Sequence, residues 1–187
     1  MNNNIDIIFF GDSLTYGYGV PKEKSWVYLT ASQLNFNYLN KGQNGDTTPS
    51  MLSRYYSSVL KYRPSKVFIM GGTNDLLCER SVSSITENIE VMIKDAADIN
   101  MRIVLGIPPR IIGAMANELF IPSSFYGYAE ESLPLLRENL ISLSEKYTTD
   151  LIDFYSIDFT SELYLDGLHL SSDGNFIMYK EALKILN

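Results

Sequence analysis

A serine near the start of the chain could supply a nucleophilic hydroxyl group, and a histidine near its end could supply the base that such a hydroxyl needs. Ser13 lies in the segment Gly11-Asp12-Ser13-Leu14, directly after an apolar run that ends at Phe10. A serine hydroxyl is a poor nucleophile unless a neighbouring base takes its proton. His169 is the one histidine of the chain, so a serine–histidine mechanism must use it. Asp166 precedes it by three residues, a spacing at which the carboxylate can hold one ring nitrogen while the other faces the serine.

Two further stretches offer hydrogen-bond donors of the kind that acyl transfer needs where an oxyanion develops. In Asn44-Gly45-Asp46-Thr47-Thr48, Gly45 lets the backbone approach a ligand without an intervening side chain. In Gly71-Gly72-Thr73-Asn74-Asp75, Asn74 can donate through its side-chain amide. Taken singly, each stretch also fits an ordinary turn, a serine after a strand is commonly a helix cap, and a single loop histidine is commonly incidental. All four stretches lie where a parallel sheet would gather them, at the carboxyl edge at which open α/β sheets bind ligands.

Strand-like and helix-like segments alternate along the whole chain, and this alternation predicts the scaffold that positions those residues. Short apolar runs predict strands over residues 5–10, 36–40, 67–70, 103–105 and 151–152. Apolar residues at three- and four-residue spacing predict helices, namely one capped by Ser25 that carries Trp26, Leu29 and Leu34, one from Met51 to Leu60, one capped by Ser84 with Glu87, one from Leu133 to Tyr147, and one from Phe176 to Leu186. Five strands interleaved with helices predict a doubly wound, three-layer α/β/α sandwich around a parallel sheet. Because we find no repeat and no linker, we expect one domain over residues 1–187.

The stretch from Arg110 to Glu131 fits this alternation least well. It is rich in glycine, proline, methionine and aromatic residues and has no clean period. Loops of this length in compact domains are often lids or binding loops. Two interpretations stay open, a substrate-binding lid and an irregular excursion packed on the body.

Composition argues against several classes of partner and site. The formal net charge is −7 and the basic residues are scattered, which disfavours nucleic acid or an anionic membrane as the main partner. One cysteine excludes an internal disulfide, and one histidine excludes a multi-histidine metal site, although a carboxylate site for magnesium or calcium stays open. We expect Cys78 to be a small buried apolar residue, because no second histidine exists to activate it. With no membrane span of roughly 20 apolar residues and no basic region typical of a signal peptide, we expect a cytoplasmic monomer.

The four chemistry-bearing stretches together resemble the signature blocks of the SGNH, or GDSL, hydrolase family. Gly11-Asp12-Ser13-Leu14, then Gly45, then Gly72-Thr73-Asn74-Asp75, then Asp166-Gly167-Leu168-His169 occur in the family's order. The resemblance implies a flavodoxin-like sandwich with a five-stranded parallel sheet. It also implies Ser13 as nucleophile, His169 as base and Asp166 as the partner of His169. The implied oxyanion donors are the N–H groups of Ser13 and Gly45 and the side chain of Asn74.

The run Gly45-Asp46-Thr47-Thr48 and the short chain most resemble the arylesterase, thioesterase and lysophospholipase branch of the family. Members of that branch are often exported, and the missing leader departs from that pattern. The resemblance implies hydrolysis of carboxylic or thio esters of small or lipid-like substrates through an acyl-enzyme, with no cofactor and no metal.

Three other functions stay open as alternatives. An O-acetylated carbohydrate could be the substrate of the same catalytic groups. The chain could also be a non-catalytic binding module, or a flavodoxin-like nucleotide binder, although residues 11–19 match neither the phosphate-loop nor the dinucleotide fingerprint. Aromatic residues could stack on a sugar or line an acyl channel. The residues that we expect to contact substrate are Asp12, Tyr16, Tyr18, Phe125 and Tyr126.

Overall fold

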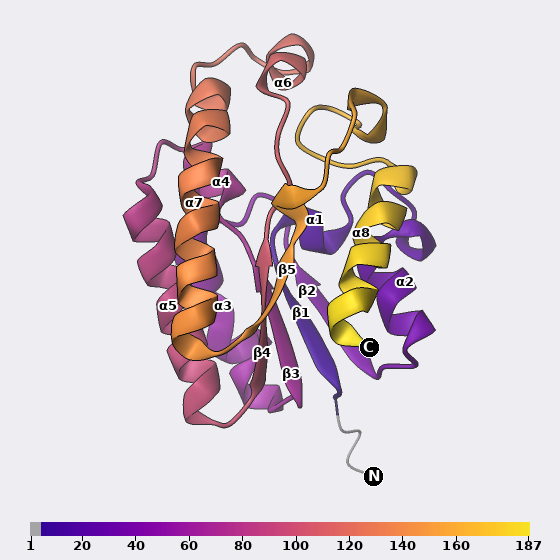
Figure 1. Cartoon of the computed structure of the whole chain (residues 1–187), viewed down its shortest axis with the longest axis vertical. Coiled ribbons are helices and arrows are strands. Elements are labelled where there is room, and N and C mark those ends of the chain that lie inside the picture. The colour runs from indigo at the N-terminus through magenta and orange to yellow at the C-terminus, as the bar shows by residue number, and fades with distance from the viewer. Residues whose placement is uncertain (1–4) are drawn as a thin grey trace.

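Five parallel strands form the sheet at the centre of the computed structural model, which describes residues 5–187 (Figure 1). The strands are β1 (Ile7–Gly11), β2 (Tyr38–Gly42), β3 (Lys66–Met70), β4 (Arg102–Ile107) and β5 (Asp150–Asp153). Their spatial order is β2-β1-β3-β4-β5, and each neighbouring pair is parallel. This is the order of flavodoxin-like sheets, so the predicted fold class and strand count are confirmed.

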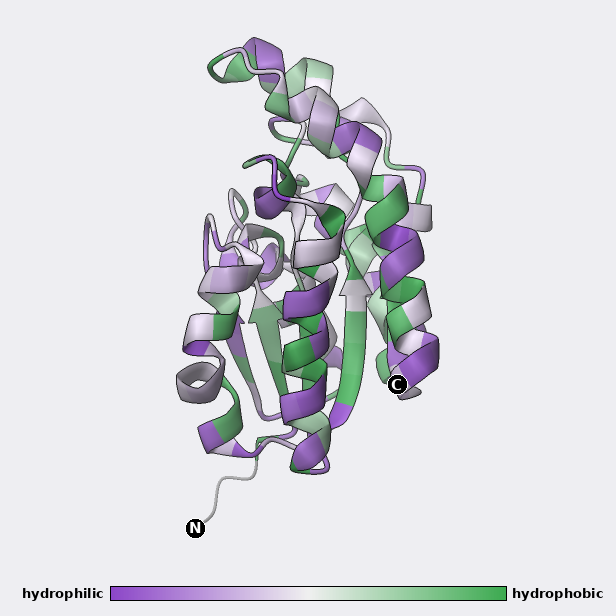
Figure 2. Ribbon diagram, turned by 90° about the vertical axis from the view of Figure 1, so that its left-hand side faces the viewer, coloured by the Kyte–Doolittle hydropathy of each residue, from purple (hydrophilic) through white to green (hydrophobic). Residues whose placement is uncertain are grey.

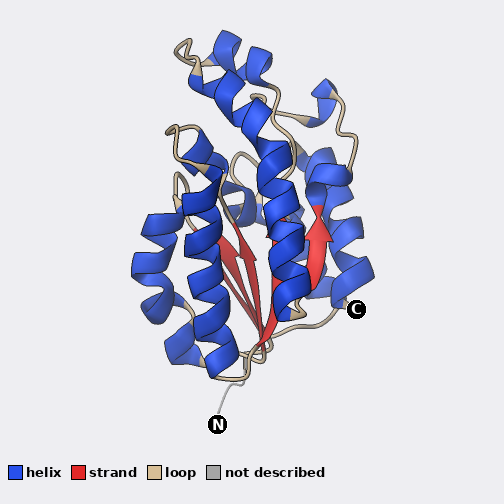
Figure 3. Ribbon diagram, turned by 60° about the vertical axis from the view of Figure 1, so that its left-hand side comes forward, coloured by secondary structure: helices blue, strands red, loops and turns tan. Residues whose placement is uncertain are grey.

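The strand residues alternate between two apolar cores, one on each face of the sheet. Ile8 and Phe10 of β1 belong to one core, and Ile7 and Phe9 belong to the other, as the period of two in a strand requires. The helices that cover the first face are α3 (Thr48–Ser58), α5 (Val82–Asp98) and α7 (Phe125–Tyr147). The helices that cover the second face are α2 (Trp26–Gln33) and α8 (Ser172–Leu186) (Figures 1 and 3). Figure 2 shows the resulting pattern, in which apolar strands are enclosed by helices that carry both apolar and hydrophilic residues.

Short helices follow three of the strands. They are α1 (Ser13–Tyr16) after β1, α4 (Thr73–Leu76) after β3, and α6 (Gly113–Leu119) after β4. Single 3-10 turns lie at Lys22–Lys24, Leu60–Tyr62, Phe154–Ser156 and Ser161–Leu163. The sequence pattern did not predict the three short helices, because elements of four to seven residues are too short to display a helical period.

The predicted second strand was placed too early in the chain. Residues 36–40 were expected, whereas β2 runs from Tyr38 to Gly42. The Phe36 N–H donates to the carbonyl of Ala31, and Asn35 adopts a left-handed backbone with φ of 52°. This is the Schellman geometry that ends a helix. Phe36 therefore closes α2, which also leaves Leu34 just beyond the helix rather than inside it.

The N-cap residue predicted for α5 was also wrong. Ser81, rather than Ser84, caps α5, and its Oγ accepts the Ser84 N–H at 3.3 Å. The earlier start places Val82 in the apolar core, which explains why the helix begins there.

Helix occupies much of the stretch from Arg110 to Glu131, in which the sequence showed no clean period. Helix α6 lies within it, and α7 begins at Phe125 and continues through Pro134. Ala129 and Leu133 already lie in the core on one face of α7. The exposed aromatic residues of the stretch, such as Phe120 and Phe125, conceal that period in the sequence. No helix within residues 5–187 combines the length and apolar character needed to cross a membrane.

Candidate active site

The serine of the first motif lies where strand β1 turns into helix α1. Asp12 is the N-cap of this helix, and its Oδ1 accepts the Leu14 N–H at 2.9 Å. Gly11 makes the tight turn possible, because a Cβ at this position would collide with the Thr15 side chain and the Met70 carbonyl. Ser13 is 6% exposed. The turn therefore holds its hydroxyl at the carboxyl edge of the sheet, beside the point between β1 and β3 where the strand order reverses.

The structure brings Ser13, His169 and Asp166 into one hydrogen-bonded chain. His169 Nε2 lies 2.9 Å from Ser13 Oγ, and His169 Nδ1 lies 2.7 Å from Asp166 Oδ2. The other carboxylate oxygen of Asp166 accepts the backbone N–H groups of Leu168 and His169 at 2.9 and 2.7 Å. The ring of Tyr18 packs against the imidazole with 4.4 Å between centroids. With Nδ1 donating to Asp166, Nε2 is the free acceptor for the Ser13 proton.

The environment of Asp166 keeps its carboxyl group ionised at neutral pH. Burial by itself raises its pKa, but the hydrogen bonds from the His169 ring and from the backbone of His169 and Leu168 outweigh that effect, so the pKa lies below its usual value. An ionised carboxylate at this position favours the imidazole tautomer with its proton on Nδ1 and stabilises the imidazolium once it forms.

Asn74 and His169 line the same small cavity. Asn74 is the second residue of α4, which follows Gly72, a glycine with φ of 117°. One N–H of its amide donates to the Asp46 carbonyl at 2.9 Å, and the amide carries a second N–H for a ligand. This Ser13 cavity measures about 20 Å³, and its lining consists of Asp12, Ser13, Leu14, Thr73, Asn74, Leu77, Leu168 and His169.

Gly45 is not among the residues that line this cavity. Its backbone has φ of 75°, in the left-handed region that favours glycine. Nothing lies within 4 Å of a Cβ added there. Glycine is therefore favoured at this position by the backbone conformation of the turn and not by a close contact. Its role as an oxyanion donor stays a prediction.

Arg54 links the end of β1 to the end of β2 and to the turn after it, and Asp75 links α4 to the start of α3. The sequence analysis gave neither residue a role. Arg54 Nε donates to Asp46 Oδ2 at 2.6 Å, and Nη2 donates to the carbonyls of Gly11 and Lys41 at 3.0 Å each. Asp75 accepts the backbone N–H and the hydroxyl of Thr48 at 2.8 and 2.7 Å. An arginine on the helix between the buried residues Met51 and Tyr55 was the available signal for Arg54, because charged residues on a core-facing turn need a partner.

Asp12 is a buried carboxyl group without a full set of partners. It is 1% exposed, and its Oδ2 has no hydrogen-bond partner among the described residues. Burial raises its pKa to about 7, against the lowering effects of the Leu14 N–H and His169, while Asp46 and Asp75 add to the rise. Asp12 thus supports the turn as an N-cap and also lines the Ser13 cavity.

We expect the difference in unfolding free energy between Asp12→Asn and wild type to shift in favour of the variant as the pH rises from 5 to 8. The folded-state pKa lies above the unfolded value, so the folded state binds more protons between about pH 4 and pH 7, and the contribution of Asp12 to stability falls as pH rises through that window. The full change amounts to about 4 kcal/mol, of which about 3 kcal/mol falls between pH 5 and pH 8. Urea unfolding of both proteins at the two pH values measures it, with the exposed Asp158→Asn as control. A difference in unfolding free energy that does not vary with pH would contradict the raised pKa.

The aromatic residues expected at the site divide into two groups. Tyr18 contacts His169, and Phe125 and Tyr126 line an apolar cavity that shares Leu77 and Leu168 with the Ser13 cavity. Tyr16 does not belong with them. It lines a different cavity, on the side of α1 that faces β2, and neither cavity lined by Ser13 includes it. Its expected contact with substrate is therefore not supported by the lining of the site. Cys78 is exposed, which overturns the expectation of a buried apolar residue.

The absence of a metal and of a cofactor stays a prediction from the sequence. Across residues 5–187, no group of three or more His, Cys, Asp or Glu side chains is arranged to hold a metal ion.

A flavodoxin-like sheet with a serine, a histidine and an aspartate linked at its carboxyl edge is an arrangement suited to a serine hydrolase. Residues 9–176 match the model of the GDSL-like lipase/acylhydrolase family, and the chain belongs to this family. The resemblance noted from the sequence is therefore confirmed.

The chain is similar to three proteins in sequence or in fold. An arylesterase of Vibrio mimicus is 29% identical over 150 residues, which cover 74% of each protein. The uncharacterized lipoprotein YqeF of Bacillus subtilis (strain 168) is 33% identical over 140 residues, which cover 67% of this chain but only 58% of the lipoprotein. A member of the lipolytic protein G-D-S-L family from Veillonella parvula DSM 2008 has the same fold, with a TM-score of 0.80, 23% identity, and coverage of 95% of this chain and 96% of its own.

The family and the arylesterase relative support an ester-hydrolysing enzyme. The cytoplasmic location expected from the sequence stays a prediction, because one of these relatives is a lipoprotein. The single domain and the monomeric state also stay predictions.

Proposed function

We propose that this chain is a serine esterase that hydrolyses carboxylic esters with an apolar acyl group. The observation that carries the proposal is the hydrogen-bonded chain from Ser13 Oγ through His169 to Asp166, with distances of 2.9 and 2.7 Å. These are the distances at which a base can take the proton of a nucleophilic hydroxyl.

The reaction proceeds in two halves through an acyl-enzyme. Ser13 Oγ attacks the ester carbonyl carbon while His169 Nε2 takes the hydroxyl proton, and the carbonyl electron pair moves onto the oxygen. The N–H groups of Ser13 and Gly45 and the Asn74 amide are the proposed donors to that oxyanion. When the tetrahedral intermediate collapses, the bond to the alcohol breaks and His169 returns the proton to the leaving oxygen. Water then attacks the acyl-enzyme in the same way and releases the acid and Ser13.

An apolar cavity beside the Ser13 cavity supports the choice of acyl group. It measures about 220 Å³, and its lining consists of Leu77, Phe120, Ser123, Phe125, Tyr126 and Leu168. Leu77 and Leu168 line both cavities, so an acyl chain attached to Ser13 would have an adjoining apolar surface. Burial of each additional methylene of such a chain is worth about 0.8 kcal/mol. Four of the six lining residues come from the stretch 110–131, which supports a role of that stretch in binding the acyl group.

A series of p-nitrophenyl esters from acetate to palmitate tests the acyl preference. We expect kcat/KM to rise from acetate to chains of intermediate length as methylenes fill the cavity. We expect Phe125→Ala to lower kcat/KM for those chains several-fold while leaving acetate nearly unchanged. Phe176→Ala is the matched control, because Phe176 is similarly exposed, 44% against 40%, but lies on α8. Cleavage of acetate alone would contradict the acyl cavity and favour the alternative of carbohydrate O-deacetylation.

Removal of the Asn74 amide is expected to lower kcat by about 10²- to 10³-fold, with a much smaller change in KM, because the oxyanion forms only on the way to the transition state. The Asn74→Ala enzyme is compared with Asn139→Ala, which loses an amide bonded to Thr86 away from the site. Steady-state kinetics on the best ester of the series measure both. Unchanged turnover in Asn74→Ala would remove this residue from the oxyanion site.

A further inference from the structure

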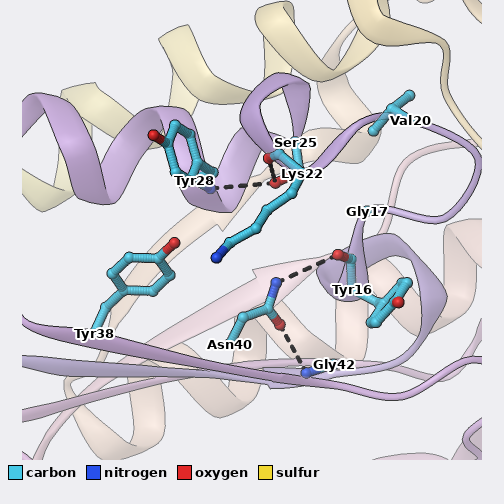
Figure 4. Close-up of a pocket in the computed structure, with 9 residues that line it drawn as sticks. All are labelled: Tyr16, Gly17, Val20, Lys22, Ser25, Tyr28, Tyr38, Asn40 and Gly42. Atoms are coloured by element: carbon cyan, nitrogen blue, oxygen red, sulfur yellow. Dashed lines mark hydrogen bonds between the residues drawn. The ribbon is translucent and has the colours of Figure 1, made fainter.

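A further cavity lies between strand β2, helix α1 and the start of helix α2 (Figure 4). Its volume is about 250 Å³, and its lining consists of Tyr16, Gly17, Val20, Lys22, Ser25, Tyr28, Tyr38, Asn40 and Gly42. None of these residues except Gly17 lines a cavity that contains Ser13. The volume suits a ligand smaller than a typical drug, since ligand pockets run from about 300 Å³ upward.

The walls of this cavity follow directly from the strand pattern. Tyr38, Asn40 and Gly42 are alternate residues of β2 and therefore point to the same face of the sheet. Gly42 lets α1 pack close to the strand, because a Cβ there would collide with the backbone of Tyr16. Asn40 donates to the Thr15 carbonyl at 2.9 Å and accepts the Gly42 N–H at 2.9 Å. The floor of the cavity is therefore fixed by hydrogen bonds before any ligand arrives.

One cation points into this cavity without a partner. In Figure 4 the Lys22 side chain extends across the opening, and its ammonium group ends between Tyr38 and Asn40. Lys22 Nζ has neither an ion pair nor a hydrogen bond within residues 5–187, and no carboxylate side chain is part of the lining. An unpaired lysine aimed into a cavity without carboxylates makes a positive spot on a chain whose formal net charge is −7.

The tyrosines add neutral donors and flat apolar surface. The Tyr38 hydroxyl is turned toward the Lys22 ammonium group in Figure 4. Burial and the neighbouring Tyr28 raise the pKa of Tyr38, so its hydroxyl keeps its proton at neutral pH and can donate. Neither hydroxyl of Tyr28 or Tyr38 has a hydrogen-bond partner in the described part of the chain. The rings of these residues, with Val20, supply the apolar walls.

We propose that this cavity is a second ligand-binding site, separate from the Ser13 site, for a small organic anion with a flat apolar body, such as an aromatic carboxylate. The Lys22 ammonium group pairs with the carboxylate, the Tyr38 hydroxyl donates to it, and the aromatic walls cover the ring. This inference does not depend on ester hydrolysis, because it rests on residues that the proposed reaction does not use.

Binding of benzoate, with the neutral benzamide as its isostere, tests the proposal. Two-dimensional ¹⁵N NMR of the whole chain reports on the backbone amides of Tyr38 and Gly42, which lie in this cavity and outside the Ser13 lining. We expect saturable shifts at these amides with benzoate and much smaller shifts with benzamide. Lys22→Met keeps the side-chain stem but removes the charge, and we expect it to weaken benzoate binding at least about tenfold.

Lys24→Met is the matched control, because Lys24 lies in the same 3-10 turn but does not line the cavity. It should bind benzoate as wild type does, and the dispersion of each spectrum shows that the variants are folded. The proposal is overturned if benzoate gives no saturable shift at Tyr38 and Gly42, if benzamide binds equally well, or if Lys22→Met and Lys24→Met behave alike. Each of these results leaves the ester hydrolysis at Ser13 unaffected, so failure here is distinct from failure of the proposed function.

Discussion

Replacement of Ser13 by alanine is expected to lower kcat for the best p-nitrophenyl ester by about 10⁴- to 10⁶-fold, the range found when a serine nucleophile is removed from other hydrolases. The hydroxyl forms a hydrogen bond to His169 Nε2, and no other group among the residues lining the Ser13 cavity combines a nucleophilic atom with a base. The fold should survive, because the backbone bonds and the Asp12 cap that shape this turn do not involve the hydroxyl.

The Ser13→Ala protein is measured beside Ser53→Ala, which loses an exposed hydroxyl bonded to the Ser50 carbonyl. Unfolding midpoints in urea should agree among the three proteins, which separates loss of chemistry from loss of structure. Ester hydrolysis that persists in Ser13→Ala would show that another residue attacks the ester.

Replacement of Asp166 by asparagine is expected to lower kcat by about 10⁴-fold at neutral pH, because it reverses the histidine tautomer. The oxygen at the Oδ1 position is fixed by the N–H groups of Leu168 and His169. The amide nitrogen of asparagine would therefore occupy the position that faces His169 Nδ1. A nitrogen that accepts this amide N–H carries no proton, so the proton of the neutral ring moves to Nε2, where it blocks transfer from Ser13.

Imidazole NMR can read this effect directly, because the chain contains one histidine. We expect the proton on Nδ1 in wild type and on Nε2 in Asp166→Asn, together with the fall in kcat. Asp158→Asn is the control for loss of an aspartate charge. An Asp166→Asn enzyme with near-normal turnover, or with the wild-type tautomer, would contradict the role proposed for this carboxylate.

The strands and the gathering of the four motifs could be predicted from the sequence because both follow from short-range patterns. Apolar runs mark the buried strands, and parallel strands bring their carboxyl ends to one edge. This rule brings Ser13 and Asn74 to one edge, whereas His169, well beyond the end of β5, needed the family resemblance as well. The structure adds the distances that make the site usable, such as 2.9 Å between Ser13 Oγ and His169 Nε2.

The parts that escaped prediction depend on contacts between segments that are distant in the sequence. Arg54 gains its partners only when α3 packs beside the ends of β1 and β2, so its own helix gives little indication of them. Tyr16 shows the limit of arguing from distance along the chain. It lies three residues after Ser13 in the sequence but lines a separate cavity, whereas Phe125 from a distant helix shares a cavity with Leu168 beside the histidine. Proximity along the chain was therefore an uneven guide to the aromatic residues near the site, because Tyr18 does contact His169.

Mass spectrometry of the acyl-enzyme tests the central proposal most directly. The wild-type protein is mixed with p-nitrophenyl octanoate, quenched with acid within the first turnovers, digested and analysed. We predict the mass of one octanoyl group on the peptide that contains Ser13, and no such mass in Ser13→Ala. Rapid hydrolysis by wild type with the octanoyl group on a different residue would contradict the assignment of Ser13 as the nucleophile.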